Sequence, residues 1–147
     1  MMNDTSRTGT PVQAGDNVPP GRIRISRFLY AVLALLFAAC IVVQVLFAGM
    51  GIFKDAADWE LHRAFVLYFD KIPLVLFVLS FVGGIRGSLR WWGIGLFAMS
   101  SLQYVTALAF ADVWMVAVWH PVNALLMFAV ALYLTRRSRG WLSGIGR

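Results

Sequence analysis

Four apolar runs divide the chain, and each has about the length needed to cross a bilayer. The runs cover about residues 28–50, 60–84, 91–111 and 113–134. A helix needs about 20 apolar residues to cross the roughly 30 Å of hydrocarbon. Because short connections join successive runs, neighbouring helices are expected to run in opposite directions. The pattern predicts an all-α integral membrane fold, an antiparallel four-helix bundle.

The ends of the chain differ from this apolar centre. Residues 1–21 are rich in Thr, Gly, Pro, Asn and Asp and contain no apolar run, so nothing there offsets the entropy of ordering. We therefore expect a disordered N-terminal tail over 1–21, a transmembrane domain over 22–137 and a short C-terminal tail over 138–147. No obvious internal repeat is visible in the sequence.

Composition supports a membrane location and suggests an orientation. Of 147 residues, 60% are hydrophobic and 14% are charged, whereas a soluble domain has about a quarter charged. The net charge is +6, and most basic residues fall in the N-terminal tail, the middle loop and the C-terminus. Cytoplasmic loops hold the excess of Lys and Arg, so these three segments are predicted to be cytoplasmic. No aromatic stacking platform accompanies the basic residues, and a nucleic-acid partner is not expected.

Each predicted span carries one polar residue at a similar depth. Gln44, Asp70, Gln103 and His120 lie six to eight residues from the outer ends of their spans, about 9 to 12 Å below the surface at 1.5 Å per residue. Asn123 follows His120 by three residues and shares its helical face. Polar groups inside a membrane are costly and mark functional positions or interhelical hydrogen bonds. The sequence predicts one polar layer near the outer side.

A charged pair stands apart in the second span. Asp70 and Lys71 are adjacent in sequence, and neighbours on a helix do not face each other, so they are not expected to form an ion pair. Arg63 precedes Asp70 by seven residues and shares its face. We therefore expect Arg63 to reach toward Asp70, and Lys71 to need another partner or a wet cavity.

The two histidines of the chain lie on helices expected to run in the same direction. A haem with both axial positions filled by imidazole needs one histidine on each of two helices facing across a bundle. His62 and His120 meet this requirement, although their expected depths differ by roughly 6 to 10 Å. The alternative is that the polar layer, including Gln44, Gln103 and Asn123, only fixes helix register through hydrogen bonds.

Four motifs carry a resemblance to a known family. They are Val43–Phe53, Leu61-His62-Arg63, Leu102-Gln103 and His120-Pro121-Val122-Asn123-Ala124. Together they resemble small four-pass bacterial membrane proteins that share a domain of unknown function, over about residues 26–137. The architecture is also similar to one half of haem A synthase, where histidines on the second and fourth helices ligate haem. Glu60-Leu61-His62-Arg63 resembles an acidic residue and His-Arg pair there, which implies haem ligation by His62 and His120.

These observations favour a small bacterial inner-membrane protein that binds b-type haem between His62 and His120, for electron transfer or haem handling. Gln44, Gln103 and Asn123 would surround the ligands. Two alternatives are a cofactor-free scaffold or assembly subunit of a membrane complex, and a small proton-linked transporter using Asp70. An enzyme is less favoured, because no phosphate-binding glycine loop or paired Cys-x-x-Cys is present. Expected partners are the lipid bilayer and either other membrane proteins or a second copy.

Overall fold

The computed structural model describes residues 19–110 and 112–143, and all regular structure in these residues is helical. The predicted all-α class is therefore confirmed. Residues 1–18 of the predicted N-terminal tail, residue 111 and residues 144–147 lie outside the described part. Helix α1 begins directly after Pro20. Its start lies before the apolar run at residue 28, so the helix also carries Arg22, Arg24 and Arg27, which precede that run.

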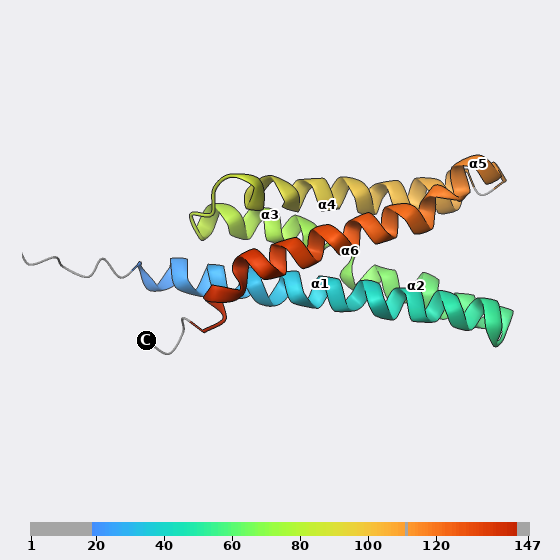
Figure 1. Cartoon of the computed structure of the whole chain (residues 1–147), viewed down its shortest axis with the longest axis horizontal. Helices are drawn as coiled ribbons and strands as arrows, with labels where there is room; N and C mark the ends of the chain where they lie inside the picture. The colour runs from blue at the N-terminus through green and yellow to red at the C-terminus, as the bar shows by residue number, and fades with distance from the viewer. Residues whose placement is uncertain (1–18, 111, 144–147) are drawn as a thin grey trace, which may run out of the picture.

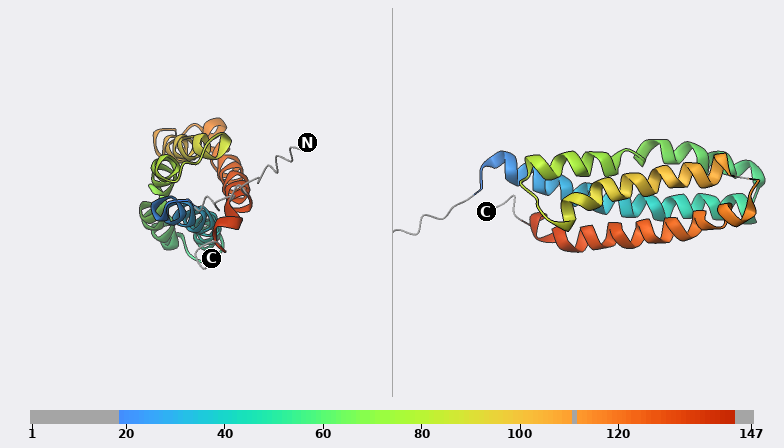
Figure 2. Two further views of the ribbon diagram at one scale, coloured as in Figure 1. Left: turned by 90° about the vertical axis from the view of Figure 1, so that its left-hand side faces the viewer. Right: turned by 90° about the horizontal axis from the view of Figure 1, so that it is seen from above.

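Four helical segments lie side by side, and the chain turns back between them (Figure 1). The first is α1 (Gly21–Phe53), and a 3₁₀ turn η1 (Ala56–Asp58) leads to the second. The elements of the other segments are α2 (Trp59–Phe69), α3 (Ile72–Val82), α4 (Ser88–Tyr104), the π-helical turn η2 (Val105–Ala109), α5 (Trp114–Ala117), α6 (Trp119–Ser138) and the 3₁₀ turn η3 (Arg139–Trp141). The start of α1, the α3–α4 turn and η3 lie at one end of the molecule (Figure 2).

Three helices are long and apolar enough to cross a membrane among the described residues: Gly21–Phe53, Ala56–Val82 and Trp114–Trp141. Three of the four predicted spans therefore have the length and the apolar composition to cross a membrane. The third predicted run, 91–111, falls mostly on α4, which has 17 residues, and on η2. Large apolar side chains cover the outer surface, including Phe53 and Trp114. A lipid environment would cover such a surface without cost.

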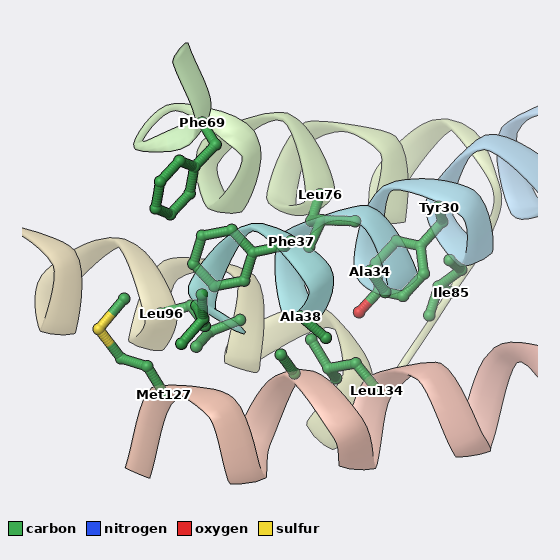
Figure 3. Packing of buried hydrophobic residues seen from close by; sticks show 12 residues of the cluster. Tyr30, Ala34, Phe37, Ala38, Phe69, Leu76, Ile85, Leu96, Met127 and Leu134 are labelled. Atoms are coloured by element: carbon green, nitrogen blue, oxygen red, sulfur yellow. The ribbon is translucent and has the colours of Figure 1, made fainter. Parts of the chain in front are cut away.

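The core is a narrow seam of buried apolar side chains between the segments (Figure 3). Phe37 of α1 contacts Phe69 of α2 with ring centroids 5.8 Å apart, and Leu76, Leu96 and Leu134 are fully buried nearby. Small residues bring the helix backbones together. At Gly93 an added Cβ would lie 2.8 Å from the backbone of Phe77, so only glycine permits this approach of α4 to α3.

The second span is interrupted, which the apolar pattern did not predict. Helix α2 ends at Phe69 and α3 begins at Ile72, so Asp70 and Lys71 form the break. Pro73 stands at the start of α3, where its missing N–H is tolerated because the first amides of a helix have no partner within it. The fourth run is likewise divided near Pro121, between α5 and α6.

Candidate functional site

A cavity of 340 Å³ lies between α1, α2, α4 and α6. Its volume falls in the range of about 300–1,000 Å³ that is typical of small-molecule sites. Apolar side chains such as Ile41 and Phe69 form most of the wall. The polar layer expected from the sequence faces this cavity through Gln44, Asp70, Gln103 and His120, and His62 and Arg63 join it.

His62 is held against α1 by two reciprocal hydrogen bonds. Gln44 Nε2 donates to the His62 carbonyl at 2.8 Å, and His62 Nδ1 lies 3.0 Å from the Gln44 carbonyl oxygen. A carbonyl oxygen can only accept, so Nδ1 carries the hydrogen. The remaining ring nitrogen, Nε2, therefore has a free lone pair, which is the form of imidazole that binds metals.

His120 is held against α4 in a related way. Its Nδ1 lies 3.2 Å from the Gln103 carbonyl oxygen and 3.3 Å from Thr106 Oγ1. Thr106 is itself fixed, because its hydroxyl lies within hydrogen-bond distance of the Leu102 and Gln103 carbonyls. The Gln103 carbonyl thus sets the same tautomer as in His62. The π-helical turn η2 begins just after this point, and such turns are frequent at functional sites.

The two imidazole rings face each other across the cavity. Their centroids are 6.3 Å apart and their planes are inclined by 53°. The depth difference of roughly 6 to 10 Å expected from straight helices therefore does not keep the rings apart. Metal-binding histidines commonly form a hydrogen bond from the other ring nitrogen to a backbone carbonyl, because this bond fixes the tautomer and the orientation of the ring.

The two histidines belong to two corresponding helical hairpins. We define the first hairpin as α1 with α2, and the second as α4 with α6. Gln44 precedes His62 by 18 residues, and Gln103 precedes His120 by 17. The correspondence extends to the core, because a buried residue lies seven positions before each glutamine (Phe37, Leu96) and seven after each histidine (Phe69, Met127). The side-chain types differ, so the sequence does not display this repeat.

Asp70 occupies the helix break at the edge of the cavity. It is only 6% exposed, and its Oδ2 accepts hydrogen bonds from Lys71 Nζ at 2.7 Å and from Tyr104 OH at 3.1 Å. The expectation that Asp70 and Lys71 would not pair is wrong, because the long Lys71 side chain reaches Oδ2 although both residues keep right-handed helical dihedrals. Arg63 does not pair with Asp70 as expected; it forms an ion pair with Glu60 on the outer surface.

Four buried polar atoms have no hydrogen-bond partner among the described residues: Gln44 Oε1, Asp70 Oδ1, Ser100 Oγ and Gln103 Oε1. All four residues line the cavity. Buried polar atoms are normally paired, so unpaired ones gathered around one cavity indicate a site that receives a ligand or water. Both glutamines contribute such an atom, one from each hairpin.

Asn123 has a different place from the one predicted beside the ligands. It is buried, and its Nδ2 donates to the Met99 carbonyl at 2.9 Å, which ties α6 to α4. Sequence reasoning also missed Ser100, Tyr104 and Thr106. Ser100 precedes Gln103 by three residues and shares its helical face, so a search for polar residues on that face would have found it. Tyr104 follows Ser100 by four residues and shares the face of Ser100.

The loop between α1 and α2 carries the charges nearest the outer end of the first hairpin. Lys54 Nζ forms an ion pair with Asp58 Oδ2 at 2.8 Å. The hydrogen bond to Asp58 raises the pKa of Lys54 above its ordinary value. This pair lies outside the cavity and caps the turn.

No group of three or more His, Cys, Asp or Glu side chains that could hold a bare metal ion is found within the described ranges. A site with only two protein ligands suits a cofactor that supplies the other metal ligands itself. The pair His62 and His120 is of that kind.

Comparison with known proteins gives one match. Residues 44–110 match the model of a family of unknown function, DUF6220. No curated protein and no solved structure matches. The predicted resemblance to a family of unknown function is thus confirmed over this part of the chain, which holds Gln44, His62, Asp70 and Gln103. The motif beginning at His120 lies outside the matched residues.

Proposed function

We propose that the four helical segments form an antiparallel bundle across a bacterial inner membrane, with both termini in the cytoplasm. The apolar outer surface and the three membrane-length helices support insertion. The end of the molecule that holds the start of α1, the α3–α4 turn and η3 carries Arg27, Arg90 and Arg139, as the positive-inside rule requires of a cytoplasmic end.

We propose further that this bundle binds a b-type haem between His62 and His120 and serves electron transfer or haem handling. The observation that carries the proposal is the pair of rings 6.3 Å apart, each with Nδ1 held by a backbone carbonyl. A metal with imidazole bonds of about 2 Å on both sides would leave the ring centroids about 6 Å apart. The residues present therefore fit an iron with two axial histidines.

The chain's residues have separate parts in this proposal. His62 and His120 would hold the iron, and the Gln44 and Gln103 carbonyls would keep their rings in the tautomer with Nε2 free. Apolar walls such as Ile41 and Phe69 exclude water. A haem held by these two histidines would supply one-electron transfer.

The test is the absorption spectrum of protein expressed with ample haem and purified in detergent. We expect a Soret band that disappears in the His62→Ala, His120→Ala double variant. Thr135→Val is a matched control, because Thr135 hydrogen-bonds only within its own helix, to Ala131, and does not line the cavity. Colourless wild-type protein would overturn the haem proposal. If His120→Ala then lowered stability alone, the polar layer would serve packing in a scaffold.

A second candidate function is proton-linked transport through Asp70. It is favoured by the buried carboxylate whose Oδ1 has no partner in the described residues and lines the cavity. In proteoliposomes, a pH-driven flux should then be lost in Asp70→Asn and kept in Glu60→Gln, an exposed carboxylate. Flux that survives Asp70→Asn would remove this candidate.

A further inference from the structure

The end of the molecule that holds the start of α1, the α3–α4 turn and η3 carries arginines and no acidic residue among those that the structure describes (Figure 2). The described carboxylates lie in the outer turns, in α2 and at the α2–α3 break: Asp55, Asp58, Glu60, Asp70 and Asp112. The ion pairs of the described residues join Lys54, Arg63 and Lys71 to acids outside this end. Within the described structure, no carboxylate therefore balances the positive charge of this end.

Two of these arginines reach the α3–α4 turn from different helices. Arg27 of α1 donates from Nε to the Gly83 carbonyl at 2.9 Å. Arg90 of α4 donates from Nε to the Ile85 carbonyl, also at 2.9 Å. Residues 83 and 85 are two positions apart, so their Cα atoms are at most about 7 Å apart. Two guanidinium groups are thus held beside one short turn, and their like charges favour an anion next to them.

An aromatic ring also fixes each of these two side chains. The guanidinium carbon of Arg27 lies 5.7 Å from the centre of the Trp141 ring, and that of Arg90 lies 4.3 Å from the centre of the Phe81 ring. A guanidinium has five N–H donors, and only Nε of each arginine forms a hydrogen bond within the described residues. Because both groups are already held in place, binding an anion would cost little side-chain entropy.

The residues around the turn belong at the level of lipid headgroups. Phe81 and Val82 close α3 as exposed apolar side chains, so the hydrocarbon region would reach this point. Trp91 and Trp92 lie in the first turns of α4 and are exposed, and tryptophan is enriched at the membrane–water interface. Arg86 is exposed within the turn itself. An arginine group and an apolar surface therefore adjoin each other at this end.

We propose that Arg27, Arg86 and Arg90 bind the phosphate of an anionic phospholipid, such as phosphatidylglycerol, in the cytoplasmic leaflet. The inference rests on the membrane insertion proposed above and is independent of the haem. Guanidinium groups bind phosphate oxygens through paired N–H donors. The acyl chains would lie along the exposed side chains of Phe81 and Val82, which favours a lipid over a free phosphate. The unbalanced positive charge favours an anionic lipid over a zwitterionic one.

The experiment is native mass spectrometry of the full-length protein in detergent, titrated with phosphatidylglycerol or with phosphatidylcholine of the same acyl chains. We expect phosphatidylglycerol to bind at lower concentration. Arg27→Gln and Arg90→Gln should each weaken its binding about fivefold, as expected for one arginine near an anionic membrane surface. Lys54→Gln removes one positive charge from the α1–η1 turn at the other end of α1 and should leave the affinity unchanged.

Equal affinity for the two lipids, or an equal loss in Lys54→Gln, would overturn this inference. Displacement of the lipid by an equal concentration of inorganic phosphate would assign the site to free phosphate and overturn the lipid assignment. Should Arg27→Gln fail to fold, Arg86→Gln, whose side chain is exposed, should still show the fivefold loss. A protein recovered in soluble form without detergent would overturn the membrane proposal as well, whereas an inserted protein without lipid preference would overturn this inference alone.

Discussion

The two hairpins hold their histidines through the same carbonyl contact but support it differently. In the first hairpin, the Gln44 side chain returns a hydrogen bond to the His62 carbonyl. In the second, Thr106 shares the His120 Nδ1 instead, whereas Oε1 is unpaired in both glutamines. The first hairpin uses one residue for both contacts, whereas the second uses a threonine within a π-helical turn.

This difference indicates what is required and what is replaceable. Both hairpins keep a glutamine carbonyl on the ring, a buried residue two turns before it and another two turns after the histidine. The means of bracing the ring varies. We infer that both hairpins must place a histidine with a free Nε2 at the cavity. The groups that hold the two rings differ, but both leave the hydrogen on Nδ1.

The largest expected effect is that of removing either histidine. If one iron is shared by both hairpins, His62→Ala and His120→Ala should each convert a six-coordinate haem spectrum into a five-coordinate one or abolish haem binding. The absorption spectrum of each purified variant checks this. A variant that keeps the wild-type spectrum would show that its hairpin supplies no ligand.

The next effect concerns a position where the hairpins differ in side-chain size. Gly93 and Ala34 both lie ten residues before the corresponding glutamine, and both are buried. Gly93→Ala places a Cβ 2.8 Å from the Phe77 backbone, which cannot move aside as a flexible side chain would. We expect about 1–3 kcal/mol of destabilisation from overpacking, measured as unfolding in mixed detergent micelles. Ala34→Gly should cost only about 1 kcal/mol, by helix propensity.

The glutamines allow a sharper comparison. Gln44→Ala removes the hydrogen bond to the His62 carbonyl and should destabilise the protein by about 1 kcal/mol. Gln103→Ala removes an unpaired Oε1, as Gln44→Ala also does, but no side-chain hydrogen bond like that of Gln44, and should be neutral or slightly stabilising, because the backbone carbonyl that holds His120 remains. Thermal unfolding of both variants in detergent compares them. Equal losses of thermal stability in the two variants would contradict the proposed difference between the two hairpins.

The smallest expected effect is that of Thr106. Thr106→Val removes a hydroxyl that is bonded within its own helix and shared with His120. We expect it to lower the free energy of unfolding by about 0.6 kcal/mol, the average for such hydrogen bonds in membranes. Thr106→Ser keeps the hydroxyl and serves as the control. In resonance Raman spectra of the haem-loaded protein, Thr106→Val should broaden the bands of the His120 ligand. The bands of His62, which Gln44 supports, should stay unchanged.

Part of this arrangement was predictable from the sequence and part was not. Helices follow from apolar runs, and Gln44, Asp70, Gln103 and His120 were found because polar residues are rare in such runs. The apolar pattern does not show the break at Asp70, since Leu, Val and Phe continue on both sides of it, whereas Pro73 marks it in the sequence. The groups that hold both histidine rings are backbone carbonyls, which every residue possesses. Residue types alone therefore cannot reveal these contacts.

The most direct test of the central claim is electron paramagnetic resonance of the oxidised, haem-loaded wild-type protein. An iron held by His62 and His120 together predicts a low-spin ferric spectrum typical of two imidazole ligands, lost in either single histidine variant. A high-spin spectrum, or a low-spin spectrum unchanged by His120→Ala, would contradict the shared site between the two hairpins.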